Sequence, residues 1–257
     1  MLSDLAGDPD LPDINDHVVE PGSRWEMLDG ELIYVPPTDA PHAERQFQLC
    51  ALLEAHTGPE FQAACELLTR TSKIDDFAPD ASVYPSAPDP RTGKRQLEQL
   101  AFEVLSTQSI GNAARKAAKL VGRGVRRVFA IDIERSRMLE WSTELENWSL
   151  LDPAGAIVDP ALATPLPIDA LIHEAKTDDA VARALVARHN PVIEAAIEAM
   201  RAESTAEAVA AVLSARGVAV TPAEREQILG ERDPARLARW IARAAVCTSA
   251  AELLAER

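Results

Sequence analysis

The sequence has few of the residues on which the commoner kinds of catalytic and cofactor site depend. Its three cysteines are too few and too scattered for a disulfide framework or a zinc site, so we expect Cys50, Cys65 and Cys247 to be small core residues in a reducing compartment. The chain contains no glycine-rich phosphate loop, no Ser-His-Asp spacing and no cluster of paired cysteines or histidines. These absences argue against a P-loop nucleotidase, a serine hydrolase and a structural zinc protein.

Long hydrophobic runs are missing as well. No apolar stretch approaches the length that spans a membrane, and the acidic N-terminus has neither the basic nor the apolar region of a secretory signal. We therefore expect a cytoplasmic protein with no membrane partner. The 257 residues, of which 47% are hydrophobic, suffice for a sizeable core and predict a core domain with an appendage.

Positive charge is scarce, and the formal net charge of -15 would repel a polyanion. The distribution is uneven, however, because residues 115–127 carry only positive charges. These are Arg115, Lys116, Lys119, Arg123, Arg126 and Arg127. A solvated helix surface is one interpretation of such a run, and a local nucleic-acid-binding face is the other.

Hydrophobic spacing predicts a mixed α/β region. Apolar runs at 24–28 and 31–35 flank Asp29-Gly30, which is the strongest short-range signal of a β-hairpin. The strand–helix–strand pattern from 100 to 133 predicts two strands paired in parallel. Helical spacing is seen at 41–56 and 110–122, and strand patterns at 61–71, 80–84, 99–105, 128–133, 138–141 and 148–151.

Composition divides the chain into three parts. Residues 1–20 are rich in Asp and Pro and predict an acidic flexible leader, and residues 21–160 carry the α/β pattern. Prolines then mark a linker, after which residues 165–257 form an Ala-, Leu-, Glu- and Arg-rich helical region. Its candidate helices are 178–188, 191–203, 206–215, 222–229, 234–245 and 249–255.

Two carboxylates occupy apolar, strand-like runs. Asp80 follows Pro79 at the start of one run, and Glu103 lies in the middle of another, between Phe102 and Val104. A buried charge is costly without a partner or a metal. Asp80 could instead cap a turn, and Glu103 could point to solvent at a strand end. Two inward carboxylates favour a site for a divalent cation.

Three further residues are candidates for the same site. Lys116 lies on the helix after the second run, from which a long side chain can reach Glu103, although an ordinary surface lysine is the alternative. Glu26 is a third candidate carboxylate, with a solvent-exposed strand end as the alternative. His42 is also a candidate, although lone histidines are more often structural.

A series of short motifs follows in a specific order along the chain. It comprises Trp25 to Leu32, His42, Pro79 to Val83, Phe102 to Ser106, Lys116, Gly124-Val125 and Ile131-Asp132. In this order and spacing the motifs resemble the Uma-two family of restriction-endonuclease-like proteins, within the PD-(D/E)XK nuclease superfamily. The resemblance covers roughly residues 20–152.

The resemblance implies a restriction-endonuclease-like α/β fold, with a mixed central sheet flanked by helices, to which the all-α C-terminal region is appended. It also implies that Asp80 and Glu103 bind Mg²⁺ or Mn²⁺, with Glu26 as a helper, and that Asp80, Glu103 and Lys116 are catalytic. The superfamily lysine usually lies two residues after the Glu, where this chain has Leu105. Lys116 instead matches the Uma-two lysine, eight residues before Gly-Val.

Two functions follow as hypotheses. The first is a metal-dependent endonuclease that hydrolyses phosphodiester bonds of DNA, in which Arg115, Lys119, Arg123, Arg126 and Arg127 hold the DNA backbone. The second is a non-catalytic or weakly active nuclease-fold scaffold or regulatory protein, acting through protein or nucleic-acid binding. The overall acidity, Leu105 and Asn112 (where the family commonly has an acidic residue) favour the second. The C-terminal helices are expected to serve self-association, as a homodimer, or target positioning.

Overall fold

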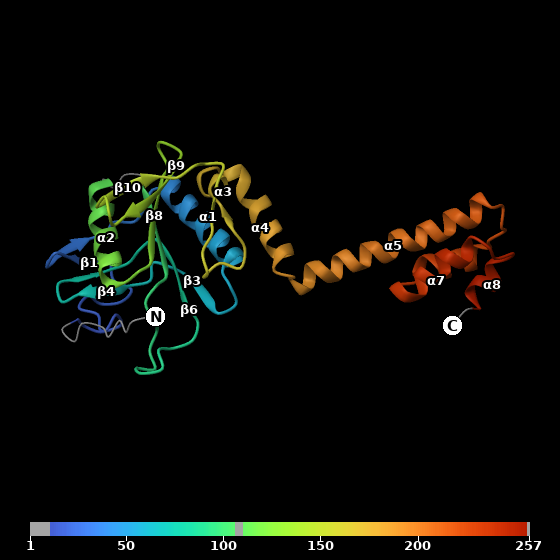
Figure 1. The fold of residues 1–257 in the computed structure, drawn as a ribbon, viewed down its shortest axis with the longest axis horizontal. Coiled ribbons are helices and arrows are strands. Elements are labelled where there is room, and N and C mark those ends of the chain that lie inside the picture. The colour runs from blue at the N-terminus through green and yellow to red at the C-terminus, as the bar shows by residue number, and fades with distance from the viewer. Residues whose placement is uncertain (1–10, 106–109, 256–257) are drawn as a thin grey trace. The chain divides into compact units, whose positions relative to one another are not determined.

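The computed structural model describes residues 11–105 and 110–255. The chain divides into two compact units, with the boundary between Arg188 and His189 (Figure 1). The first unit holds the three β-sheets of the described residues and the second is helical. The predicted fold class, a mixed α/β region followed by an all-helical region, is confirmed.

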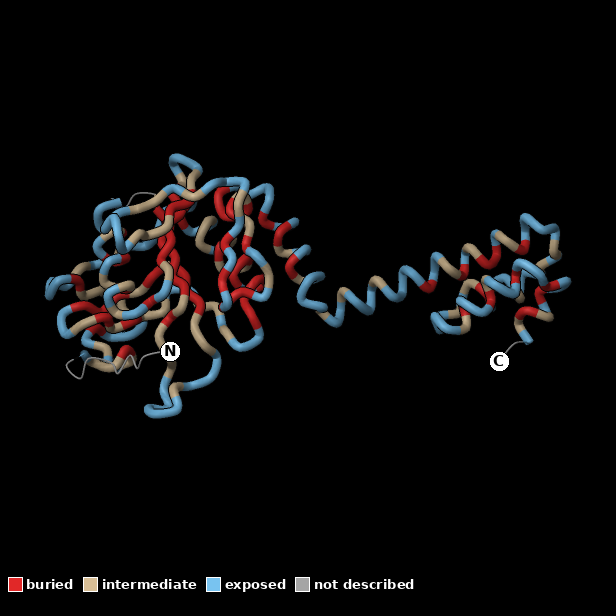
Figure 2. The backbone as a smooth tube through the Cα atoms, in the orientation of Figure 1, coloured by how far each residue is buried: buried red, intermediate tan, exposed pale blue. Residues whose placement is uncertain are grey.

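The central sheet of the first unit has the strand order β10-β9-β8-β7-β6-β3. Its parallel pair is β7 with β8, as the strand–helix–strand pattern predicts, and its other neighbours are antiparallel. The strands are β3 (Phe61–Cys65), β6 (Ala81–Pro85), β7 (Leu100–Leu105), β8 (Arg127–Asp132), β9 (Arg137–Ser142) and β10 (Asn147–Leu150). Figure 2 shows that the middle of this sheet is buried.

A second sheet in the same unit is smaller and has the strand order β2-β1-β5-β4. Its strands are β1 (Trp25–Leu28), β2 (Glu31–Tyr34), β4 (Thr69–Ser72) and β5 (Asp75–Phe77). The predicted hairpin is confirmed, with Asp29 and Gly30 at φ values of 55° and 80°. The single strand expected at 61–71 is wrong: Glu66, at φ 50°, turns the chain out of the central sheet and β4 joins the smaller one.

Two helices flank the central sheet (Figure 1). Helix α1 (Ala40–His56) packs Leu49, Leu52 and Leu53 among the β7 and β8 side chains of Phe102, Val104, Phe129 and Ile131. Helix α2 (Ile110–Arg123) packs against the other face through Ala113, Ala117 and Leu120. Because side chains alternate along a strand, β7 presents Phe102 and Val104 toward α1 but Ala101, Glu103 and Leu105 toward α2. Glu103 therefore shares a face of the sheet with Lys116.

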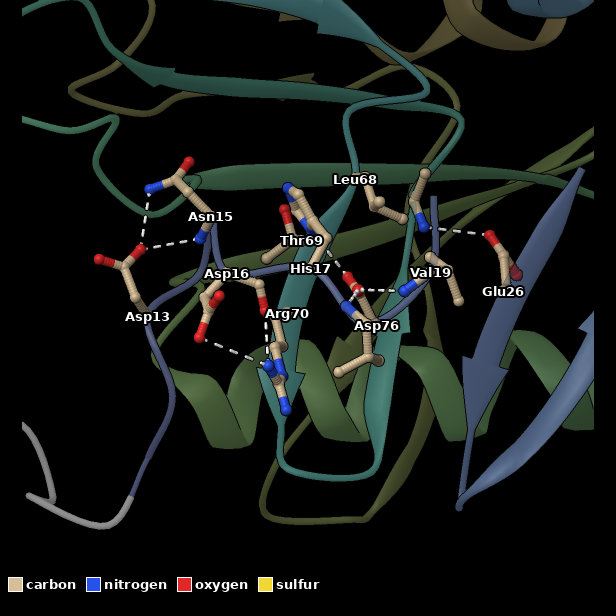
Figure 3. Close-up of polar contacts among 12 residues, drawn as sticks. Asp13, Asn15, Asp16, His17, Val19, Glu26, Leu68, Thr69, Arg70 and Asp76 are labelled. Atoms are coloured by element: carbon tan, nitrogen blue, oxygen red, sulfur yellow. Dashed lines mark hydrogen bonds and ion pairs between the residues drawn. The ribbon is translucent and has the colours of Figure 1, made fainter. Parts of the chain in front are cut away.

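The N-terminal segment 11–20 is packed against the smaller sheet (Figure 3). Ile14 and Val19 are buried, and the backbone N–H groups of Val18 and Val19 donate to Asp76 Oδ2 at 2.7 and 3.3 Å. His17 Nδ1 lies 3.0 Å from Asp76 Oδ1. Asp76 is fully buried and needs these donors. The expected flexible leader is thus wrong for residues 11–20, and residues 1–10 lie outside the described residues.

The first unit also extends beyond the boundary predicted near residue 160. After β11 (Ala156–Ile157) and β12 (Leu166–Pro167), α3 (Ile168–Ile172), the 3₁₀ turn η1 (Glu174–Lys176) and α4 (Thr177–Ala187) follow. Their apolar side chains, including Ile168, Leu171 and Ala180, belong to the core that contains α1. The linker prolines therefore join parts of one unit, because the apolar residues after them complete its core.

The second unit is built from α5 (Pro191–Ala215), α6 (Pro222–Gly230), α7 (Pro234–Ala244) and α8 (Ala250–Leu254). The two helices expected at 191–203 and 206–215 are one continuous helix. Leu213, Ile228, Leu237 and Trp240 form the centre of its core, together with Cys247. In the described part of the chain, no helix is both long and apolar enough to cross a membrane.

The expectation for the cysteines is correct only for Cys247, which is buried and free. Cys50 on α1 and Cys65 at the end of β3 form a disulfide, with Cα atoms 6.5 Å apart. Their separation of 15 residues in the sequence did not suggest a bridge. The pairing arises because α1 packs beside β3 in the fold.

Candidate active site

Asp80 is held just before β6, by contacts of its side chain with β7 and with α1. Because Ala81 pairs with Phe102, Asp80 lies opposite Glu103 at the next position of the antiparallel register. Its Oδ2 accepts the backbone N–H of Val104 at 2.6 Å, and His42 Nε2 on α1 lies 3.2 Å from its Oδ1. These two contacts fix the direction of the Asp80 carboxylate. The alternative from the sequence, in which Asp80 caps a turn, does not describe them.

Glu103 is inside the protein and does not point to solvent. Its side chain is only 1% exposed, and its Oε1 has no hydrogen-bond partner among the described residues. Burial raises the pKa of Glu103 to about 8; the charges of Asp80 and Glu26 act in the same direction and the Lys116 ammonium opposes them. A buried carboxyl oxygen without a donor is costly, and is the kind of group that a bound cation would satisfy.

Lys116 reaches from α2 into the same region. It is 8% exposed, and its Nζ lies 2.8 Å from Glu26 Oε2 and 3.3 Å from the Ala78 carbonyl oxygen. Burial by itself would lower the pKa of Lys116, but the carboxylates of Glu103 and Glu26 more than offset it, and the pKa is raised. Lys116 is therefore a charged, positioned ammonium and not an ordinary surface lysine.

Glu26 holds this lysine in place. Besides the ion pair, its Oε1 accepts the backbone N–H of Ala78 at 3.0 Å, so its carboxylate turns toward β5 and the chain before Asp80 (Figure 3). Glu26 is thus brought into the site, as the sequence predicts, but both of its oxygens contact Lys116. Its predicted role as a metal ligand stays a prediction.

A cleft with a volume of about 250 Å³ opens over these groups. Glu26, His42, Asp80 and Lys116 lie along it, and Glu103 is not among the residues that line it. The other lining residues are Glu20, Gly22, Ser23, Arg24, Trp25, Val35, Pro36, Thr38, Glu66, Leu68 and Ala78. The segment after the docked residues 11–20 therefore forms part of the wall.

The donor set suits a hard divalent cation of the kind that keeps several waters. In the parts of the chain that the structure describes, no group of three or more His, Cys, Asp or Glu side chains could hold a metal ion. Mg²⁺ is commonly bound through one or two carboxylates, with waters completing its coordination. Asp80 and Glu103 are two carboxylates of this kind, and their binding of a cation stays a prediction.

The basic residues of 115–127 are not gathered on one face beside the cleft. Lys119 Nζ pairs with Asp29 at 2.6 Å and with Asp75 at 2.9 Å, and Arg115 also pairs with Asp29. Arg123 donates to the Pro12 carbonyl, Arg126 pairs with Asp159, and Arg127 pairs with Glu140 and Asp159. Each positive charge is thus engaged within the chain, and DNA binding by these residues stays a prediction.

Arg24 is the site residue that the sequence did not suggest. It is exposed, it lines the cleft, and within the described chain it has no ion-pair partner. Its neighbour Trp25 belongs to one of the family motifs in the sequence. Leu105, in place of the superfamily lysine, packs against Ala113 and Ala130, so that position is part of the apolar core. The ammonium is supplied from α2 instead.

Comparison with known proteins gives a consistent result. The family model Uma2, described as "Putative restriction endonuclease", matches residues 10–166. Among solved structures, the chain is similar to a "putative nuclease belonging to DUF820 from Anabaena variabilis ATCC 29413", with 18% identity and a TM-score of 0.49, over 58% of this chain and 89% of that chain. No curated protein matches this chain.

Proposed function

We propose that this chain, which belongs to the Uma2 restriction-endonuclease family, is a metal-dependent endonuclease that hydrolyses phosphodiester bonds of DNA. The observation that carries the proposal is the buried, unpartnered Oε1 of Glu103, opposite Asp80 and on the same face of the sheet as Lys116. A structural carboxylate would be paired with a donor. The Oε1 of Glu103 is buried without such a donor among the described residues, next to a cleft that Glu103 itself does not line.

Asp80 and Glu103 would hold Mg²⁺ or Mn²⁺ through their carboxylate oxygens. When bound, the cation supplies positive charge that makes water a better nucleophile and stabilises negative charge on the phosphate. His42 and the Val104 N–H keep Asp80 in position for this role, and their hydrogen bonds fix the direction of its oxygens. Such preorganisation avoids reorienting the ligands during the reaction.

Lys116 supplies a fixed positive charge on the cleft side. Because Glu26 and the Ala78 carbonyl hold its ammonium, Lys116 is placed to contact a phosphate oxygen or to orient the attacking water. The raised pKa of Lys116 keeps it protonated at neutral pH, so it stabilises charge and does not act as a general base. Glu26 acts through Lys116 and is a positioning residue.

Plasmid cleavage with Mg²⁺ and with Mn²⁺ tests the proposal. Wild type should convert supercoiled plasmid to nicked and linear forms, whereas Glu103→Gln and Lys116→Met should each lower the rate by about 100-fold or more, the size typical of losing an electrostatic catalytic group. Glu54→Gln, an exposed change on α1, is the matched control and should cleave like wild type. Equal cleavage by all four proteins would place the activity elsewhere.

A second candidate is a non-catalytic nuclease-fold scaffold, which the apolar Leu105 and the net charge of -15 favour. This alternative is supported if wild type binds Mn²⁺ and DNA but cleaves neither plasmid nor oligonucleotide. Isothermal titration with Mn²⁺, for wild type and Glu103→Gln, separates a cation site without turnover from the absence of any site.

A further inference from the structure

An exposed aromatic pair lies on the hairpin beside the cleft. Trp25 on β1 and Tyr34 on β2 are paired across the two strands, with ring centroids 5.3 Å apart and 66° between the ring planes. Trp25 is 43% and Tyr34 is 52% exposed. Large exposed aromatic side chains that line a polar cleft are more informative than scattered exposed apolar residues. Trp25 is among the residues that line the cleft, and Tyr34, which is not, contacts the Trp25 ring.

The hairpin joins the aromatic pair to the ammonium. Glu26, the next residue on β1 after Trp25, holds Lys116, and Trp25, Glu26 and Lys116 all line the cleft. The aromatic pair is therefore tied, through one residue of rigid β-strand, to the position of the ammonium. A group stacked on Trp25 would be held at a fixed offset from Lys116.

Arg24 adds a positive charge to the same edge of the cleft. It precedes Trp25, lines the cleft and is exposed, and it has no ion-pair partner in the described part of the chain. The basic residues of α2 and β8 differ from it, since each is engaged by an acidic side chain or a carbonyl. Lys116 also lines the cleft but is paired with Glu26, so Arg24 differs from it in having no ion-pair partner among the described residues.

We propose that Arg24, Trp25 and Tyr34 bind an unpaired nucleotide, and that the DNA substrate is single-stranded at the point of cleavage. Arg24 would contact a phosphate and the aromatic pair would stack on the neighbouring base. This proposal rests on the proposed nuclease function and names the substrate class of the same site. Inside a duplex both faces of a base are covered by its neighbours, so stacking of an internal base on a protein ring requires that the base be unpaired.

The electrostatics of the chain favour the same substrate. Tight binding to a duplex depends mainly on many Lys and Arg contacts with phosphates, and the basic residues at 115–127 are already engaged internally. Stacking adds binding that does not depend on releasing counterions. A single-stranded substrate can therefore use both the stacking surface of Trp25 and the charge of Arg24, whereas a duplex would rely on phosphate contacts alone.

Fluorescence anisotropy with the full chain in EDTA tests the proposal without cleavage. The probes are a fluorescein-labelled 20-nucleotide oligo-dT and a blunt duplex of the same length. We expect the single strand to bind about tenfold more tightly than the duplex, and Trp25→Ala to weaken it by about tenfold, as loss of one stacked base implies. Phe47→Ala, at an exposed aromatic on α1 that does not line the cleft, is the matched control and should bind like wild type.

Salt dependence separates the two kinds of contact. Arg24→Gln should make the slope of log affinity against log salt shallower by about 0.7, the amount expected for one phosphate contact on a single strand, whereas Trp25→Ala should leave the slope unchanged. Circular dichroism confirms that each variant is folded.

Equal binding of duplex and single strand, or wild-type binding by Trp25→Ala, overturns the proposal. The proposal is also overturned if wild type elutes as an oligomer in size-exclusion chromatography and Trp25→Ala elutes as a monomer. The aromatic pair would then be an interface between copies of the chain. Failure of the nuclease function is distinguishable, since it appears as missing cleavage of either DNA in Mg²⁺ or Mn²⁺ while the binding preference in EDTA persists.

Discussion

Replacing Glu103 with glutamine should stabilise the metal-free protein while abolishing cleavage. The carboxyl is buried and its Oε1 has no hydrogen-bond partner among the described residues, so the folded state disfavours its charged form. Glutamine has nearly the same shape as a protonated glutamic acid and carries no charge. The variant therefore keeps the packing of β7 against α2 and removes the cost of ionisation.

The magnitude follows from the pKa of Glu103, which burial raises from 4.5 to about 8. Between these two values the folded protein binds a proton that the unfolded chain has released, so the stability of the folded state falls as the pH rises. Each pH unit in this window costs about 1.4 kcal/mol. At pH 7 the wild type should thus be less stable than Glu103→Gln by about 3 kcal/mol, and at pH 4.5 the two should be nearly equal.

Urea unfolding in the presence of EDTA, at pH values from 5 to 8, measures this difference. Glu98→Gln is the matched control. Glu98 is also fully buried and its Oε2 also has no hydrogen-bond partner among the described residues, but its Oε1 accepts hydrogen bonds from Arg95, at 2.8 Å, and from Thr69. Loss of the charge at Glu98 weakens a paired arrangement and should destabilise the protein by roughly 1–3 kcal/mol at pH 7.

A lower stability for Glu103→Gln at pH 7 would refute the reasoning. The same conclusion would follow if wild type and variant ran parallel across the whole pH range, because the carboxyl would then ionise equally in the folded and unfolded states. A variant that is more stable but still cleaves DNA would separate the burial of Glu103 from the proposed catalytic role.

Three other predictions concern stability. Burial lowers the pKa of His56, whose Nδ1 lies 2.7 Å from the Leu52 carbonyl oxygen. Because the unfolded chain then binds a proton that the folded chain does not bind, the stability of the protein should fall as the pH drops below about 6.5. Thermal melts at pH 5 to 8 should show a smaller fall for His56→Gln. The Cys50–Cys65 bridge closes a loop of 15 residues, so its reduction should lower the free energy of unfolding by about 3 kcal/mol. Urea unfolding with and without dithiothreitol measures this loss, and an unchanged midpoint would contradict the prediction. Leu213→Ala should destabilise the second unit by about 2–5 kcal/mol and leave the unfolding of the first unit unchanged in calorimetry; a shift of both transitions would show that the units do not unfold independently.

Local structure in this chain was readable from short stretches of sequence. The Asp29-Gly30 turn needs two residues that tolerate positive φ, and both adopt it. Helix α1 begins after Asp39, whose side chain accepts the His42 N–H at 3.1 Å, and α2 ends at Gly124 with φ 116°. Each of these signals depends on neighbours within a few residues, so no long-range contact is required to interpret it.

Two of the predictions that the structure corrected depended on partners distant in sequence. The acidic segment at 11–20 has too few apolar residues to fold by itself, but Asp76 lies within reach of its N–H groups and fixes it. The positive run at 115–127 contains no acid, yet Asp29, Asp75, Asp159 and Glu140 pair with it. The number of positive charges in this stretch of sequence therefore does not predict how much unpaired positive charge the folded chain presents there.

The sequence by itself determined the hairpin, the two sheet-covering helices, the parallel strand pair and the candidates Asp80, Glu103 and Lys116. Only the tertiary structure decided that Glu103 faces α2 rather than solvent, that Glu26 holds Lys116, and that Arg24 and Trp25 border the cleft. The physical reason is that hydrogen bonds of turns and helices close within a few residues, whereas burial and ion pairing depend on side chains that only the folded chain brings together.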